Sequence, residues 1–155
     1  MEIKVRKGRK EDLTQVIELV KELAIFEKSL EEVENTIELM EKEGFSDRPA
    51  FEFFVAENDS IIIGMALYFF SYSTWKGRSM YLDDLIVAEK FRGKGVGKML
   101  FARLIEVAKA EDCGKLHWQV LDWNTPAIDY YKSLNARLDE SWINCWLDRA
   151  ELQKF

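Results

Sequence analysis

The sequence predicts an α/β sandwich built around a mixed sheet, and three observations carry this prediction. The chain has 155 residues, which suits a single domain, 1–155, with one sizeable core. Strand-like and helix-like patterns follow one another in the order β-α-α-β-β-β-α-β-α-β. Hydrophobic residues make up 48% of the chain and charged residues 32%, a composition that argues against disorder.

The first half of the chain contains one short strand, two helices and two longer strands. Residues 3–6 alternate between apolar and polar side chains, as in a strand, and apolar residues recur at helical spacing from Glu11 to Ala24. The capping-box pattern that begins at Ser29 predicts a second helix ending near Gly44. Strands are then expected at 51–57 and 61–70, joined by a turn at 58–60.

The second half alternates strands and helices. A strand is predicted at 79–87, followed by a glycine-rich segment and a long amphipathic helix that begins near Val96. A strand at 116–121 precedes a helix at 124–134, in which Pro126 is tolerated in the first turn. We expect a last strand at 142–147 and a short helix in the tail.

Charge is distributed unevenly along the chain. The net charge is −6, which disfavours a nucleic-acid partner, yet residues 90–98 carry four bases and no acid. Residues 10–43 hold eleven acids and four bases. Either these are solvated helix faces and a basic loop, or they mark a cationic substrate at one place and an anionic cofactor at the other.

Sequence features argue against a membrane or secreted protein. Apolar stretches are too short to span a bilayer, and the N-terminus lacks a signal region. Cys113 and Cys145 show neither a disulfide framework nor metal spacing, and His117 is the only histidine, so no metal site is predicted. We therefore expect a cytoplasmic protein with no membrane partner.

The glycine-rich segment is the strongest local signal for a ligand. Gly93, Gly95 and Gly97 follow a strand and open a helix, where backbone N–H groups can converge on an anion. The spacing is not that of a P-loop, and the position fits a dinucleotide fingerprint poorly. A phosphate or pyrophosphate site is therefore predicted, with a simple strand-to-helix turn as the alternative.

Two pairs of residues are candidates for proton transfer. Asp83 and Asp84 lie in an otherwise apolar strand, where alternation predicts that they face opposite sides of the sheet. One interpretation is that one aspartate forms a buried ion pair or hydrogen-bonded pair while the other faces solvent. The other interpretation is that one of them faces a cationic substrate or relays the substrate's proton. Tyr130 and Tyr131 are adjacent on a helix, so one can pack in the core while the other reaches a cleft.

Several motifs together resemble one family. Arg92-x-x-Gly95-x-Gly97, after a strand that ends in 85–87, resembles the acetyl-CoA motif of the GCN5-related N-acetyltransferases (GNAT). Segments 21–27, 68–78, 81–84, 120–124 and 131–132 resemble the diamine acetyltransferase group, which includes spermidine/spermine and thialysine acetyltransferases. The runs 72–78 and 121–124 look most like the thialysine branch.

The resemblance implies a mostly antiparallel central sheet, acetyl-CoA as co-substrate, a homodimer and a set of site residues. It implies that Tyr131 is the general acid for the departing thiolate and that Asp83 is the acceptor of the amine proton. The cofactor residues that it implies are Leu85, Ile86, Val87, Arg92, Gly93, Lys94, Gly95, Val96, Gly97, Lys98, Asn124, Thr125, Pro126, Ala127 and Ser133. The amine residues are Phe26, Glu27, Ser73, Asp83 and Glu140.

Two departures from the family pattern bear on the substrate. Where many relatives have Glu-Asp this chain has Asp83-Asp84, and where the spermidine-type enzymes have an acid it has Ser73. The sequence thus predicts direct acetyl transfer from acetyl-CoA to a small primary amine, a lysine-like amino acid or a diamine. Two alternatives stay open: acetylation of a protein lysine or N-terminus, and a CoA-binding sensor without catalysis.

Overall fold

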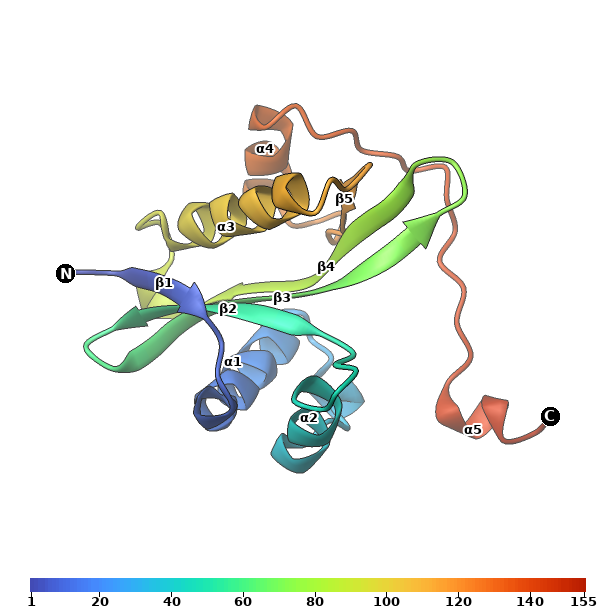
Figure 1. Ribbon diagram of the computed structural model, residues 1–155, viewed down its shortest axis with the longest axis horizontal. Helices are drawn as coiled ribbons and strands as arrows, with labels where there is room; N and C mark the ends of the chain where they lie inside the picture. The colour runs from blue at the N-terminus through green and yellow to red at the C-terminus, as the bar shows by residue number, and fades with distance from the viewer. The chain divides into compact units, whose positions relative to one another are not determined.

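A five-stranded sheet organises the first 119 residues (Figure 1). Its strands lie in the order of the sequence: β1 (Lys4–Lys7), β2 (Glu52–Asn58), β3 (Ile61–Ser73), β4 (Gly77–Val87) and β5 (Leu116–His117). Neighbouring strands pair antiparallel, except that β5 runs parallel to β4. The predicted mixed, mostly antiparallel sheet with flanking helices is confirmed.

The computed structural model describes all 155 residues, which cluster into two compact units, Met1–Gln119 and Val120–Phe155. The first unit contains the sheet and the helices up to α3. The second unit contains α4 (Thr125–Ser133) and α5 (Arg149–Leu152). A single domain over 1–155 stays a prediction.

Helices cover both faces of the sheet in the first unit (Figure 1). On one face lie η1 (Lys10–Asp12), α1 (Leu13–Phe26), η2 (Leu30–Glu32) and α2 (Ile37–Gly44). Their apolar side chains pack with those of β2, β3 and β4 into the main core, which includes Val16, Met40, Val55, Met65 and Ile86. On the other face lies α3 (Val96–Ala110), preceded by η3 (Glu89–Phe91). None of the helices is both long and apolar enough to cross a membrane.

The second helix is shorter than the capping box predicted. Ser29 makes no side-chain cap bond and precedes only the 3₁₀ turn η2, which ends at the extended residue Val33. Thr36 is the true N-cap of α2, since its Oγ1 accepts a hydrogen bond from Leu39 N at 3.1 Å. The prediction was wrong because the chain has two cap candidates seven residues apart, Ser29 and Thr36, and only Thr36 makes the side-chain bond that starts the helix.

Two hairpins set the register of the long strands. The predicted turn between β2 and β3 is confirmed, and Asp59 and Ser60 both have positive φ, as a type I′ turn requires. The next hairpin joins β3 to β4 farther along than expected, because β3 continues to Ser73. Ser73 Oγ accepts hydrogen bonds from the N–H groups of Trp75 and Lys76, at 3.2 and 3.1 Å, and so orders this turn.

A β-bulge at Asp83 interrupts the regular alternation from which Asp83 and Asp84 are predicted to face opposite sides. Asp84 pairs with Leu67 and Leu82 pairs with Tyr68, so Asp83 has no partner on β3. The extra residue shifts the alternation, and Tyr81 and Asp84 therefore share a face although they lie three positions apart. That face is the one covered by α1, because Leu67 packs against the core beneath α1.

Two predicted strands near the C-terminus are shorter or absent. The strand predicted at 116–121 is limited to β5, and the strand predicted at 142–147 does not form. Within the second unit, Asp139 instead binds the backbone N–H of Ser141 and the indole N–H of Trp142. A strand requires a partner for its backbone groups, and no strand of this chain pairs with 142–147. The predicted short tail helix is confirmed as α5.

Candidate active site

The last residues of β4 present an unpaired backbone edge. Ala88 N donates to Ile63 O at 2.9 Å, and hydrogen-bonded and non-bonded pairs alternate in an antiparallel ladder. Val87 and Leu85, opposite Gly64 and Ala66, therefore direct their N–H and C=O groups away from β3. On that side β5 pairs only with Met80 and Tyr81, so an extended ligand can occupy the edge beyond.

The glycine-rich segment turns from this edge into α3. Gly95 is the N-cap of α3, with φ +82°, and the first helical bond runs from Met99 N to Gly95 O at 3.1 Å. The N–H groups of Val96 and Gly97 have no partner within the helix, as at any helix start. Together with the helix dipole they are suited to bind an anion, and the phosphate site that the sequence predicts here stays a prediction.

The loop is open where a phosphate would approach. A Cβ built on Gly93 or Gly95 meets no atom within 4 Å, and one built on Gly97 meets only Val87 Cγ2, at 3.8 Å. The positive φ angles of Gly93 and Gly95 explain their residue type. The space outside the loop and its free N–H groups fit a pyrophosphate.

The three basic side chains of this segment differ in what they contact. Arg92 donates from Nε to Val87 O at 3.0 Å and lies 4.8 Å from the ring of Phe26. Lys94 lies over the Phe91 ring at 5.1 Å. Lys94 lies within the turn and Lys98 in the first turn of α3, whereas Arg92 contacts the end of β4 and α1.

Three carboxylates meet at the bulge. Burial, together with the charges of Asp83 and Glu27, raises the pKa of Asp84 to about 7. Partial loss of hydration also raises the pKa of Asp83 and of Glu27, which is the C-cap residue of α1. Like charges held together in this way favour a cation as ligand and favour a proton on one of the acids.

Aromatic and polar side chains extend from the acids along the same face. The rings of Phe69 and Tyr81 lie 5.2 Å apart, and Tyr81 contacts His117 at 4.8 Å. His117 Nε2 and Ser71 Oγ lie 3.2 Å apart, and burial lowers the pKa of His117. These side chains suit an aliphatic amine whose ammonium meets the acids, whose chain lies along the aromatic rings and whose far end is polar.

The second unit contains the remaining predicted residues. Asn124 is the N-cap of α4, Pro126 lies in the first turn, and Tyr131 is buried in the last turn of the helix. Burial, together with Tyr130, raises the pKa of Tyr131, so its phenol is protonated at neutral pH. Ser133 Oγ donates to the Tyr130 carbonyl, while Glu140 lies exposed in an irregular segment.

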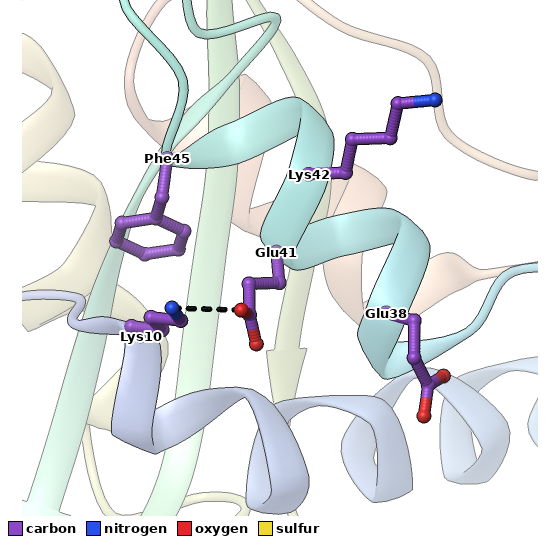
Figure 2. Close-up of a pocket in the computed structure, with 5 residues that line it drawn as sticks. All are labelled: Lys10, Glu38, Glu41, Lys42 and Phe45. Atoms are coloured by element: carbon purple, nitrogen blue, oxygen red, sulfur yellow. Dashed lines mark ion pairs between the residues drawn. The ribbon is translucent and has the colours of Figure 1, made fainter.

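A cavity of about 290 Å³ lies elsewhere, between η1 and α2 (Figure 2). Lys10, Glu38, Glu41, Lys42 and Phe45 line it, and Lys10 Nζ pairs with Glu41 Oε1 at 2.7 Å. None of the predicted site residues lines this cavity. Its main charges neutralise each other, so in this part of the acidic segment the interpretation as a solvated helix face fits better than a cationic substrate.

Comparison with known proteins decides the family. A sequence model described as the acetyltransferase (GNAT) family matches residues 13–136. The chain belongs to the GNAT acetyltransferase family. Members of this family use acetyl-CoA as co-substrate, in keeping with the open edge of β4 and the anion site at α3.

Individual relatives agree with the GNAT assignment. The chain is 36% identical over 143 residues to a thialysine N-epsilon-acetyltransferase from Bos taurus, covering 87% of this chain and 84% of that protein. It is 33% identical over 158 residues to a human spermidine/spermine N(1)-acetyltransferase-like protein 1, covering 96% of this chain and 23% of that protein. A solved V. cholerae integron cassette protein shares the GNAT fold with a TM-score of 0.80 and 23% identity, over 99% of this chain and 97% of that one.

Sequence reasoning named both Asp83 and Asp84 as candidates for proton transfer and then preferred the one that is less buried. It chose Asp83 as proton acceptor, whereas the structure gives Asp84 the larger burial and the carboxylate neighbours. The signal was the pair of acids in an apolar strand, but the bulge that decides between them depends on pairing with β3. The side chains of Phe69 and Tyr81 were likewise treated only as strand residues.

We predict that Gly95→Val raises the acetyl-CoA dissociation constant about tenfold or more, equivalent to ~1.4 kcal/mol. The added side chain occupies the space through which the phosphates approach and strains a backbone with φ +82°. Calorimetric titration with acetyl-CoA measures the effect.

Gly77→Val is the matched control, since Gly77 has φ +79° and equally open surroundings but lies in the β3–β4 hairpin. Both variants should lose a similar free energy of unfolding, and only Gly95→Val should lose cofactor affinity. Equal affinity in the two folded variants contradicts the loop assignment.

Proposed function

We propose that this protein transfers the acetyl group of acetyl-CoA to the primary amine of a small cationic substrate. The substrate class is a lysine-like amino acid such as thialysine, or a short diamine. The observation that carries the proposal is the carboxylate cluster of Glu27, at the end of α1, with Asp83 and Asp84, shortly before the end of β4. The resemblance to thialysine acetyltransferases supports the same substrate class.

The cofactor lies along the end of β4 and over the start of α3. Backbone groups of Leu85 bind the extended arm, the N–H of Val87 faces its thioester end, and the N–H groups of Val96 and Gly97 bind the pyrophosphate, assisted by Lys94. For residues 124–127 and Ser133 of the second unit, cofactor binding remains what the family resemblance implies. Bound there, the thioester supplies the acetyl group.

Asp84 takes the proton of the amine, directly or through water, while Asp83 and Glu27 hold the cation. An alkylammonium has a pKa of ~10.4, and an ordinary aspartate is ~6 units more acidic. A pKa of about 7 for Asp84 halves that gap. Since each unit is worth ~1.4 kcal/mol, the raised pKa removes ~4 kcal/mol from the cost of deprotonating the amine.

Two further groups serve the transfer itself. The N–H of Val87 points to the open edge of β4 and can donate to the oxygen that gains negative charge during attack. The phenol of Tyr131, held protonated by its burial, donates a proton to the departing thiolate. Direct attack then needs no group on the protein to carry the acetyl.

Ser73 sets the length of the substrate. It orders the hairpin at the far end of β3 and carries no charge, so a long polyamine finds one fewer anion there than in the spermidine-type enzymes. The binding of a short amine, or of one whose far end bears both an ammonium and a carboxylate, does not depend on that anion.

The protein acts as a homodimer through the segment 142–147. Trp142, Ile143 and Trp146 are 78%, 87% and 75% exposed, although their pattern is that of a strand. Such side chains are costly to leave in water, and a second copy of the chain offers both a partner for the backbone and cover for the rings.

We predict that Asp84→Asn removes the rising limb near pH 7 from the pH profile of kcat/KM, with a loss of ~10²-fold or more. In the wild type the limb reports loss of the Asp84 proton, at a pKa of about 7. Asp83→Asn is the control. It should retain the limb and move it to lower pH, because the Asp83 charge raises the pKa of Asp84. A limb lost in Asp83→Asn and kept in Asp84→Asn makes Asp83 the acceptor.

The same substitution should stabilise the fold in alkaline solution. The pKa of Asp84 is higher in the folded protein than the ~3.9 of an unfolded chain, so the native state loses stability as pH rises from 4 to 7. Asp84→Asn removes this loss and should raise the free energy of unfolding at pH 8 by on the order of 1–3 kcal/mol. Urea unfolding at pH 4 and pH 8 measures it.

We predict that Tyr131→Phe lowers kcat by ~10² or more with little change in melting temperature. The substitution deletes one hydroxyl and keeps the ring. Tyr130→Phe, one position earlier on α4, is the control and should keep kcat within about threefold. A Tyr131→Phe enzyme with wild-type kcat, where chemistry limits the rate, removes the phenol from the mechanism.

We predict a higher kcat/KM for thialysine, lysine or putrescine than for spermine or a lysine-containing peptide. Ser73→Asp should shift the ratio of spermine to thialysine upward by about fivefold, as expected for a partly exposed charge pair. The new carboxylate can still accept from Trp75 and Lys76, so the hairpin should persist. Peptide as the best substrate favours a protein acetyltransferase, and no turnover of any amine favours a sensor.

We predict a solution mass of twice 18.2 kDa by light scattering. Ile143→Asp should weaken the dimer about tenfold or more, because it places a charge in the covered segment. Leu152→Asp, on the exposed side of α5, should leave the mass unchanged. A monomeric wild type contradicts the dimer.

A further inference from the structure

A contact between α1 and the beginning of the glycine loop joins two regions that the proposed function uses separately. Glu22 Oε1, on α1, accepts a hydrogen bond of 2.7 Å from Glu89 N, the first N–H of η3. The same oxygen lies 3.7 Å from Arg92 Nη2. One carboxylate thus contacts both ends of the short connection between β4 and the loop.

Arg92 also contacts a backbone carbonyl of β4 and an aromatic ring of α1. Its Nε donates to Val87 O at 3.0 Å, and its guanidinium lies 4.8 Å from the ring centre of Phe26. The planar side chain therefore spans from the free edge of β4 to α1. Since these contacts occupy its Nε and one face, Arg92 serves to fix the loop rather than to meet the phosphates as Lys94 can.

The contact on α1 lies next to the amine site. Phe26 is the last residue of α1, and Glu27 follows it as the C-cap. The Glu27 charge acts on Asp84, so the two carboxylates are near each other. A change in the position of Arg92 therefore moves the ring that precedes Glu27.

We propose that Glu22 and Arg92 are positioning residues that couple the cofactor loop to the amine site, so that each ligand raises the affinity for the other. This inference rests on the proposed function. A bound pyrophosphate fixes the loop and holds Arg92 against Phe26, which removes freedom from the end of α1 before the amine arrives. Because coupling between two sites is reciprocal, a bound amine must tighten cofactor binding by the same factor.

The coupling predicts an asymmetric effect of losing Glu22. Glu22→Gln keeps an oxygen for Glu89 N but releases Arg92 from its anion. The guanidinium can then turn toward the phosphates, so CoA affinity should stay equal or increase while the amine loses its preorganised site. The Glu22–Arg92 pair is more than a third exposed on both sides, so stability should change little.

Calorimetry with thialysine, in the absence and in the presence of saturating CoA, tests the coupling. We expect CoA to tighten thialysine binding to the wild type by about fivefold or more, the usual lower range for coupled sites. In Glu22→Gln the factor by which CoA tightens thialysine binding should fall to near one, with an unchanged melting temperature. Arg92→Lys should lose the factor too, because an ammonium cannot bond Val87 O and lie flat on Phe26 in the same way.

Glu18→Gln is the matched control. Glu18 lies one turn earlier on α1, where it pairs with Lys21 at 2.9 Å, and the substitution removes the same charge. It should keep the wild-type coupling factor. A wild type that acetylates thialysine, but whose factor is the same in Glu22→Gln as in Glu18→Gln, overturns the coupling alone. A wild type that binds CoA and neither binds nor acetylates any amine overturns the proposed function, and the coupling with it.

Discussion

Everything proposed for this protein depends on the way β4 parts from its neighbours. Along Met80 and Tyr81 the strand is bonded on both sides, but toward Val87 it is bonded only to β3. Four residues before that end, the bulge at Asp83 shifts the alternation of the strand and brings Asp84 to the face beneath α1. One strand thereby provides a free backbone edge for an extended ligand and a carboxylate site for a cation.

This arrangement destabilises the charged form of the acids. Asp84 is half-buried beside two other carboxylates and forms no ion pair with a basic side chain. A fold selected for stability alone would place an apolar side chain there, as at Ile86 two positions on. Groups held at such a cost are typical of sites that move protons, since a raised pKa brings a carboxylate closer to the amine that it must deprotonate. By contrast, Asp12 accepts two bonds from Arg6 and its pKa is lowered, as expected of a structural carboxylate.

Features fixed by local chemistry could be predicted from the sequence, whereas those fixed by distant partners could not. The glycine loop was predictable because φ near +80° at Gly93 and Gly95 and the start of α3 follow from neighbouring residues. The bulge was not, because it exists only in the pairing of β4 with β3. The segment 142–147 has the pattern of a strand but no partner in the chain. The family resemblance could be seen in the sequence because its motif, Arg92-x-x-Gly95-x-Gly97, is a continuous segment that needs no distant partner.

The account is tested most directly by the backbone amides at the end of β4. Hydrogen exchange followed by NMR, with and without CoA, reports each N–H separately. Val87 and Leu85 should exchange quickly in the free protein and become protected when CoA binds. Ala88, already bonded to Ile63 O, should change little. If CoA binds tightly and the Val87 and Leu85 amides stay as exposed as before, the free edge of β4 is not the cofactor site.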